Sequence, residues 1–424
     1  MSFYPRKILP EIMAWVGKVP IIVIIGARQV GKTVVLKLLA EQLQATGVEA
    51  KQILYLDLED LRTLEICNRD PDFFERYLTL QGVDLSRKAY VFIDEIQYHE
   101  NPTNFLKLIA DHEKNIQLIV SGSSALEIRQ TFKDALTGRK QVFHLQTLRF
   151  EEFLVFKEDE VLLRWYRENS FRSEHEKDFD RIGFEIVKTK LQELANDFII
   201  YGGYPAVVKE SEEKFKIGRL QEIVQTYIRK DIKDLARIEN VVAFNRLMIL
   251  LAGRAGNLLN LNELSKEAGL SRATLEKYVL LLENTFVVKL LTPYFTNMKT
   301  ETVKMPKLYF LDTGQVNSLL LNFNALEQRP DAGALVENFV FKQLYAKLTI
   351  TDRLNFWRNQ NKNEVDFILN GEPFEVKFQH FSGPEIPKSL RQFLEKYRPG
   401  HTYVVTRDYY HRDENRTFLP YFLL

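Results

Sequence analysis

The stretch IIVIIGARQVGKTVV, from Ile21 to Val35, constrains the fold of this chain more than any other. An apolar, β-branched run over 21–25 predicts a buried parallel strand, and residues 34–46 are predicted as a helix. Between them the pattern GxxxxGK[ST] is complete, at Gly26, Gly31, Lys32 and Thr33. Strand, glycine turn and helix together predict a phosphate-binding loop, because glycine lets successive backbone N–H groups point into one concavity at a helix N-terminus. The alternative is a glycine turn in an unrelated α/β unit.

The side chains of this loop have predicted roles in binding a nucleotide. Lys32 is expected to reach the β- and γ-phosphates, and the Thr33 hydroxyl is expected to take one place on Mg²⁺. The predicted nucleotide-binding residues are Gly26, Ala27, Arg28, Gln29, Val30, Gly31, Lys32, Thr33 and Val34.

Composition restricts the class of protein. The 424 residues suggest two or three domains, and 45% hydrophobic residues are enough for each to bury a core. The net charge of +1 gives no overall basic field, so any binding of nucleic acid must come from local patches. The single cysteine, Cys67, excludes a disulfide framework. No apolar run approaches a membrane helix and the N-terminus lacks a signal-peptide core, so we expect a cytoplasmic protein without a membrane partner.

A second strand is expected to deliver carboxylates to the same sheet edge. Residues 89–94, AYVFID, form an apolar run that ends in Asp94 and is followed by Glu95. In a parallel sheet this places both acids at the carboxyl edge, where nucleotides bind. Asp94 would hold Mg²⁺, and Glu95 would act as general base on the attacking water. The alternative is that the acid only caps the end of the strand.

Two further side chains are candidates for this site. Ser121 or Ser123, after the predicted strand 116–120, could sense the γ-phosphate or align the water; equally, they could cap a helix from Ala125. Arg139 precedes the predicted strand 141–145 and could stabilise transition-state charge, in cis or across the interface of a homo-oligomer. The alternative for Arg139 is an ordinary surface arginine.

These features resemble the AAA+ superfamily of P-loop ATPases over about residues 18–150. The resemblance implies an α/β P-loop NTPase fold with a five-stranded parallel sheet. It also implies ATP and ADP as ligands. No residue of the chain by itself selects ATP over GTP, so this preference comes from the resemblance alone. The remaining predicted strand covers residues 51–58, and the predicted helices cover 8–17, 60–68, 72–80 and 102–114.

The middle of the chain is predicted to be mainly helical. Gly202, Gly203 and Pro205 predict a turn within residues 198–208, whose function the sequence leaves open. On a predicted helix over 221–235, Arg229, Lys230 and Asp231 could face the nucleotide or an adjoining domain, but an exposed charged helix is the more economical interpretation.

Residues 259–291 resemble a winged helix-turn-helix. Helices are predicted over 262–268 and from Ser271, separated by Gly269, with wing strands over 286–291 and 307–311. DNA recognition would place Arg272, Thr274 and Lys277 toward a groove. Residues 257–299 hold five basic and four acidic side chains, which is no clear basic excess, so a winged helix that binds protein or is structural is the alternative.

The last part of the chain places an acid on a predicted helix over 333–348, an aspartate on a strand over 363–369 and Glu-x-Lys on a strand over 373–378. This order resembles the PD-(D/E)xK nuclease-like core. The resemblance implies that Asp366 and Glu375 ligate Mg²⁺, that Lys377 steadies the transition state or orients water, and that Glu337 is an accessory ligand. Residues 331–424 carry 13 basic and 12 acidic side chains, so a degenerate nuclease fold used for packing is the alternative.

Taken together, the chain is similar to a large prokaryotic family of AAA+-type ATPases with a C-terminal winged-helix and nuclease-like region. The expected parts are the ATPase domain over 1–150, a helical region over 151–256, the winged helix over 257–320 and the nuclease-like domain over 321–424. Three functions are open. The first is an ATPase whose nucleotide state is coupled to DNA. The second is an ATP-gated nuclease acting on DNA or RNA, and the third is a regulatory NTPase switch that binds a protein partner.

Overall fold

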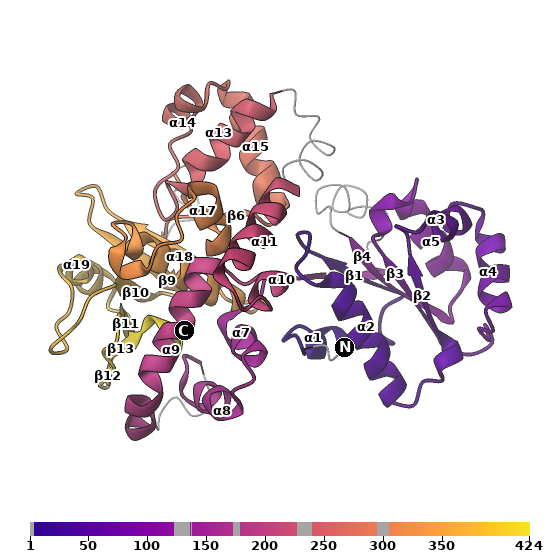
Figure 1. Ribbon diagram of the computed structural model, residues 1–424, viewed down its shortest axis with the longest axis horizontal. Coiled ribbons are helices and arrows are strands. Elements are labelled where there is room, and N and C mark those ends of the chain that lie inside the picture. The colour runs from indigo at the N-terminus through magenta and orange to yellow at the C-terminus, as the bar shows by residue number, and fades with distance from the viewer. Residues whose placement is uncertain (1–3, 123–135, 137, 173–178, 227–239, 295–304) are drawn as a thin grey trace. The chain divides into compact units, whose positions relative to one another are not determined.

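The computed structural model describes residues 4–122, 136, 138–172, 179–226, 240–294 and 305–424. The chain forms two compact units, described here one after the other (Figure 1). Unit 1 consists of Met1–Thr147, Thr226–Ile238 and Asn284–Phe286, and unit 2 consists of Leu148–Gln225, Glu239–Glu283 and Val287–Leu424.

Unit 1 is built on a five-stranded sheet in the order β2-β3-β4-β1-β5, and every neighbouring pair in it is parallel. The α/β fold predicted from the sequence is therefore confirmed. Its strands are β1 (Ile21–Ile25), β2 (Ile53–Asp57), β3 (Ala89–Asp94), β4 (Ile116–Gly122) and β5 (Lys140–His144). Its helices are α1 (Leu9–Met13), α2 (Lys32–Ala45), α3 (Leu61–Cys67), α4 (Pro71–Leu80) and α5 (Pro102–His112).

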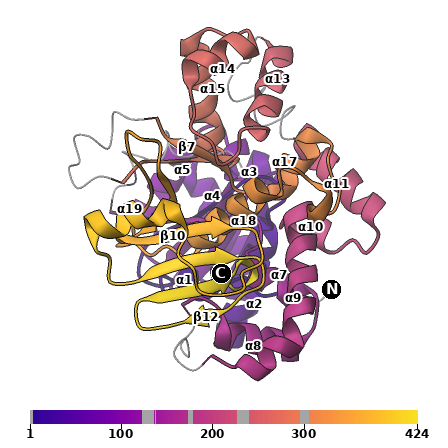
Figure 2. The same cartoon turned by 90° about the vertical axis from the view of Figure 1, so that its left-hand side faces the viewer.

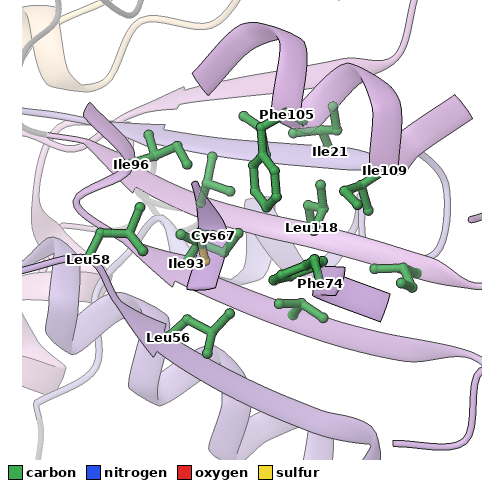
Figure 3. Packing of buried hydrophobic residues seen from close by; sticks show 14 of the residues in the cluster. Ile21, Leu56, Leu58, Cys67, Phe74, Ile93, Ile96, Phe105, Ile109 and Leu118 are labelled. Carbon is green, nitrogen blue, oxygen red and sulfur yellow. The ribbon is translucent and has the colours of Figure 1, made fainter. Parts of the chain in front are cut away.

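One hydrophobic core of unit 1 lies between the sheet and helices α3 to α5 (Figure 3). Phe74 of α4 and Phe105 of α5 meet edge to face with ring centroids 5.1 Å apart. They pack with alternate residues of the central strands, such as Ile93 and Leu118, which is the period of two that strand geometry imposes. Cys67 belongs to the same cluster and is fully buried, as expected of a small apolar residue.

Unit 2 begins with a helical layer and continues through a helix group that stands apart at the top of Figure 2. The helices of the first layer are α7 (Phe150–Phe156), α8 (Glu160–Asn169), α9 (Arg181–Tyr201), α10 (Pro205–Val208) and α11 (Glu213–Thr226). The second group is α13 (Val241–Ala252), α14 (Leu261–Ala268) and α15 (Arg272–Asn284). The predicted roles of Arg229, Lys230 and Asp231 fall outside the described residues.

Helices α14 and α15 reproduce the predicted helix pair. Gly269 ends α14 in the left-handed conformation, with φ of 69°, which glycine adopts without strain. The antiparallel strands β6 (Val288–Leu291) and β7 (Lys307–Phe310) follow. All four residues of β7 are buried, although a wing that contacts DNA would be solvent-exposed. The winged helix therefore stays a prediction.

The end of unit 2 is a mixed six-stranded sheet in the order β12-β13-β11-β10-β9-β8. Its strands are β8 (Leu354–Arg358), β9 (Glu364–Leu369), β10 (Glu372–Lys377), β11 (Thr402–Thr406), β12 (His411–Arg412) and β13 (Arg416–Pro420). The helices of this part are α17 (Thr313–Leu320), α18 (Ala332–Ala346) and α19 (Lys388–Tyr397). Helix α18 packs on β10, and α19 packs on β9. The three antiparallel strands β8 to β10 thus follow one helix and precede another, with β11 added parallel to β10.

The turn at Gly202 and Gly203 has a structural explanation. The carboxylate of Asp312, at the start of α17, accepts hydrogen bonds from the backbone N–H of Gly203 at 2.9 Å and of Gly314 at 3.0 Å. Gly202 has φ of 78°, and a Cβ added to it would lie 2.0 Å from an Asp312 oxygen. The buried ammonium of Lys342 pairs with the same carboxylate at 3.2 Å. Asp312 therefore joins the α9–α10 turn, α17 and α18.

Candidate functional site

The glycine turn after β1 is shaped by two different constraints. Gly31 has φ of 98° and caps α2, a conformation that a side chain would strain. Gly26 is required by space, because a Cβ there would lie 2.2 Å from the carbonyl oxygen of Leu145. Gln29 also has positive φ, at 60°. The loop therefore curls tightly into the first turn of α2, which begins at Lys32, two residues earlier than predicted.

The side chain of Lys32 lies folded against this loop. It is 3% exposed, and its ammonium donates hydrogen bonds to the carbonyl oxygens of Gly26 at 3.2 Å and Ala27 at 3.0 Å. One oxygen of the Glu95 carboxylate lies 3.9 Å from the Lys32 nitrogen. Thr33 is exposed. The structure thus brings the predicted lysine and the predicted general base to the same edge of the sheet.

Asp94 is the last residue of β3 and is 2% exposed. Its two carboxylate oxygens are held by different strands: the Tyr55 hydroxyl of β2 donates to one at 2.7 Å, and the Ser121 hydroxyl of β4 donates to the other. Burial, and next the hydrogen bond to Asp94, raise the pKa of Tyr55 well above its usual range, so the phenol stays a donor. The carboxylate is therefore fixed in one orientation.

Glu95 follows with an unusual backbone conformation. Its φ is 56°, and its N–H donates to the Ser121 hydroxyl oxygen at 3.1 Å. The side-chain amide of Gln97 donates to the Glu95 carboxylate. Ser121 is thus placed between both acids, where it supports the turn at the end of β3. The alternative candidate Ser123 lies outside the described residues.

The structure does not bring Arg139 to this group within one chain. Arg139 precedes β5, and its carbonyl accepts from the N–H of Ile21 at the start of β1. The phosphate loop follows the other end of β1, so Arg139 lies at the opposite edge of the sheet. Its guanidinium pairs there with Asp111 at 2.6 Å. A role in cis is therefore excluded by the direction of the strands.

Sequence reasoning missed two residues of this region. The first is Tyr55, described above. The second is Arg6, whose buried guanidinium donates to the carbonyl of Val30 at 2.7 Å and to that of Gln146 at 2.8 Å. Arg6 thereby ties the segment before α1 to the phosphate loop. For Tyr55, the one sequence signal that could have suggested a place near the site was its position two residues before the end of a strand, on the same face as Asp57.

The residues at this edge fit a nucleotide with Mg²⁺. Backbone N–H groups at the start of α2 and a buried ammonium suit phosphate oxygens. A carboxylate held by two hydroxyl donors, together with a threonine hydroxyl, gives the oxygen ligands that Mg²⁺ takes.

A second group of charged side chains lies in unit 2. The Asp366 carboxylate of β9 accepts from the backbone N–H of Val376 at 2.8 Å. Glu375 of β10 accepts from Lys377 at 2.5 Å and from the Ser389 hydroxyl. Its other oxygen is buried and has no hydrogen-bond partner. Burial, then the carboxylates of Glu337 and Glu375, raise the pKa of Asp366 well above its usual range. We call this group, with Glu337, Glu364 and Lys307, the carboxylate centre.

Lys307 was not predicted as part of this centre. Its ammonium lies 3.0 Å from Glu337, 2.6 Å from Glu364 and 3.8 Å from Asp366. Burial alone would lower the pKa of Lys307, but these three carboxylates raise it above its usual range, so the group is an ammonium. Among the residues that the structure describes, no three acids, histidines or cysteines are grouped as a metal site.

The three residues predicted to face DNA lie on or near the surface of α15. Arg272 and Lys277 are exposed, and the Arg272 guanidinium donates to Glu276 at 2.9 Å and to Asn262 at 3.1 Å. The Thr274 hydroxyl bonds with that of Ser271 at 2.8 Å, at the N-terminus of the helix. Arg272 is therefore paired within the helix group.

No described helix has the length and apolar character to cross a membrane.

Comparisons with protein families divide the chain in three. Residues 18–154 match an AAA domain, which contains the phosphate loop, Asp94 and Glu95. Residues 192–326 match a domain of unknown function (DUF8612), and residues 332–423 match another (DUF4143). The first unit is thus similar in sequence, as well as in sheet order, to AAA-type ATPase domains.

Comparisons over most of the chain find two uncharacterized relatives and one solved structure. The chain is 25% identical to the uncharacterized protein MJ1544 of Methanocaldococcus jannaschii, over 84% of this chain and 73% of that protein. It is 24% identical to the uncharacterized protein Rv2008c of Mycobacterium tuberculosis, over 89% of this chain and 74% of that protein. The Walker-type ATPase PABY2304 of Pyrococcus abyssi is 12% identical with a TM-score of 0.48, over 75% of this chain and 96% of that chain.

Proposed function

We propose that this protein binds ATP at the loop of residues 26–34 and hydrolyses it with Mg²⁺. The observation that carries the proposal is the convergence of a buried Lys32 and the Asp94–Glu95 pair at one sheet edge. The match of residues 18–154 to an AAA domain supports it. The four parts expected from the sequence remain our proposal for how the chain divides by function.

Each residue has a role that follows from its position. The loop N–H groups and Lys32 bind the phosphates, with the Lys32 ammonium exchanging carbonyl oxygens for phosphate oxygens. Thr33 and Asp94 hold Mg²⁺, which when bound neutralises charge on the phosphates. Glu95 accepts the proton of the attacking water. Tyr55 and Ser121 hold Asp94 in place.

The experiment measures nucleotide binding and Mg²⁺-dependent hydrolysis on matched variants. We expect Lys32→Ala to abolish binding, because the ammonium that faces the phosphates is lost. Glu95→Gln is expected to keep binding and to stop turnover, since an amide cannot accept the proton. Lys51→Ala, which removes an exposed lysine of the same unit, is the control and should behave like the parent. Hydrolysis by Glu95→Gln at the parental rate would remove Glu95 from the mechanism.

A coupling to DNA is tested in the same assay. The helix pair α14–α15 with the following hairpin supports a winged-helix interpretation, in which Arg272 and Lys277 face a groove. Stimulation of hydrolysis by DNA, lost in Arg272→Ala and Lys277→Ala together, is the expected result of that coupling. Hydrolysis indifferent to DNA favours a nucleotide-dependent switch that binds a protein partner.

A nuclease is the second candidate function, and the arrangement of α18, β8 to β10 and α19 favours it. In that function Asp366 and Glu375 would hold Mg²⁺, with Glu337 accessory, and Lys377 would stabilise the transition state. Cleavage of a plasmid or an oligonucleotide that is lost in Asp366→Ala and Lys377→Ala would support it. No cleavage over several substrates and metals counts against it.

For the ATPase site, Arg139 is proposed to act only across an oligomer interface.

A further inference from the structure

The first residue of β7 is held in place from both sides. Lys307 pairs with Leu291 of β6 on one edge and forms a bridge with Leu258 on the other. Around it, the N–H of Leu259 donates to the carbonyl of Pro306 at 2.8 Å, and that of Leu308 to the carbonyl of Asn257 at 3.1 Å. The segment between α13 and α14 thus fixes the backbone from which the Lys307 side chain departs.

The Lys307 side chain ends inside the carboxylate centre and is 3% exposed. Its closest carboxylate oxygens come from a helix, Glu337 of α18, and from a strand, Glu364 of β9. The Tyr309 hydroxyl donates to the same Glu337 oxygen at 2.6 Å, and Arg358 pairs with the other end of Glu364 at 2.7 Å. These contacts leave the ammonium in the space that the acids enclose.

A divalent ion bound by Glu337 and Asp366 would need that same space. The Lys307 ammonium already pairs with an oxygen of Glu337 at 3.0 Å and lies 3.8 Å from an oxygen of Asp366, so an ion on these two ligands would have to displace it. The buried oxygen of Glu375 that has no hydrogen-bond partner is a single ligand. Mg²⁺ requires near-octahedral coordination by several oxygens, and one such atom does not supply it.

We propose that the Lys307 ammonium is the resident cation of the carboxylate centre and keeps a divalent metal ion out of it. The charge of the centre is then offset in part by a side chain of the protein itself, and β7, which follows the α13–α15 group, supplies that side chain. This goes beyond the proposed ATPase, which lies in the other unit and does not depend on it. It also means that the metal-dependent nuclease is closed while Lys307 stays in place.

The test measures Mn²⁺ binding by electron paramagnetic resonance in the full chain without nucleotide. All proteins carry Lys32→Ala, so that the phosphate loop contributes little. With Lys307 intact, we expect Mn²⁺ binding to be the same with and without Asp366→Asn, because the carboxylate centre holds no ion. Lys307→Met is expected to bind one additional Mn²⁺ per chain, at least tenfold more tightly than any Mn²⁺ bound by the chain with Lys307 intact. Adding Asp366→Asn to Lys307→Met should abolish this additional binding. Lys289→Met, which removes a lysine of the adjacent strand β6, is the control and should gain nothing.

Either of two results overturns the proposal. One is Mn²⁺ bound to the chain with Lys307 intact and lost in Asp366→Asn. The other is a folded Lys307→Met protein that gains no Mn²⁺. If Lys307→Met is unfolded in chelator, refolding on addition of Mn²⁺ supports the proposal. If it does not fold in either condition, the Mn²⁺ titration of the chain with Lys307 intact decides: binding that Asp366→Asn removes overturns the proposal, and the absence of such binding supports it. ATP hydrolysis by the parent is measured separately, so failure of the ATPase is distinguished from failure here.

Discussion

Lys32 in unit 1 and Lys307 in unit 2 occupy comparable positions and have opposite surroundings. Each is the first residue of its element, and each side chain is 3% exposed. Lys32 donates to two backbone carbonyls of its own loop, with a carboxylate at 3.9 Å. Lys307 has two carboxylates within 3.0 Å and a third at 3.8 Å.

Partners, rather than burial, distinguish these two lysines, since both side chains are 3% exposed. Carbonyl oxygens are neutral acceptors, and an ammonium can exchange them for phosphate oxygens at modest cost. Partly buried carboxylates cannot release a buried ammonium without leaving uncompensated charge. Lys32 is thus able to take an anion, whereas Lys307 already has its anions.

The largest expected effect that separates the two lysines is on stability. Lys307→Met should lower the free energy of unfolding by about 3–5 kcal/mol, because it leaves three partly buried carboxylates without their shared buried cation. Lys32→Met should cost about 1 kcal/mol, since only hydrogen bonds to neutral carbonyls are lost. Urea unfolding of both variants beside the parent measures the difference. Equal losses would break the comparison.

A smaller effect is expected at Tyr55. Its hydroxyl donates to Asp94 from the neighbouring parallel strand, as the Tyr309 hydroxyl donates to Glu337 in the carboxylate centre. Tyr55→Phe removes a hydrogen bond to Asp94 and frees the carboxylate to turn. The Mg²⁺ concentration for half-maximal hydrolysis should rise by about tenfold, as when outer partners of metal ligands are lost. Tyr90→Phe, on the adjacent strand, is the control. An unchanged Mg²⁺ dependence would show that Tyr55 only packs.

The smallest effect is expected at Arg139, which lies at the sheet edge opposite to Lys32. Arg139→Ala removes a partly exposed ion pair with Asp111 and should cost less than about 1 kcal/mol of stability. Hydrolysis should stay near the parental rate in dilute protein, where subunits are apart. At concentrations that favour an oligomer, a loss of about 10³-fold is the result expected from the proposed role of Arg139 across the interface, and an unchanged rate there would remove that role.

Local sequence patterns predicted the parts of the structure that local physics determines. The β-branched run of β1, the glycine loop and the strand ending in Asp94 lie where expected, because apolar periodicity and glycine conformations are properties of short segments. The direction of parallel strands could also have excluded Arg139 in cis. A residue that precedes a parallel strand lies at the edge opposite to the loop that follows the strand beside it.

Contacts between distant segments were not predictable from those patterns. Lys307 looked like the first residue of a wing strand, and its three carboxylates come from residues 30 to 59 positions later in the chain. Tyr55 contacts Asp94 only because β2 lies beside β3, a neighbour relation that the alternation of apolar residues does not determine. Both are products of packing across the sequence.

The contacts of Asp312 have a consequence for how unit 2 folds. Its hydrogen bond to Gly203 spans 109 residues, and its ion pair with Lys342 spans another 30. The conformational entropy of closing such long loops must be lost before the contacts can stabilise the chain, which slows folding. Asp312 is therefore expected to be unpaired in early folding intermediates. Substituting it should mainly accelerate unfolding, so its effect would be a shorter lifetime of the folded state.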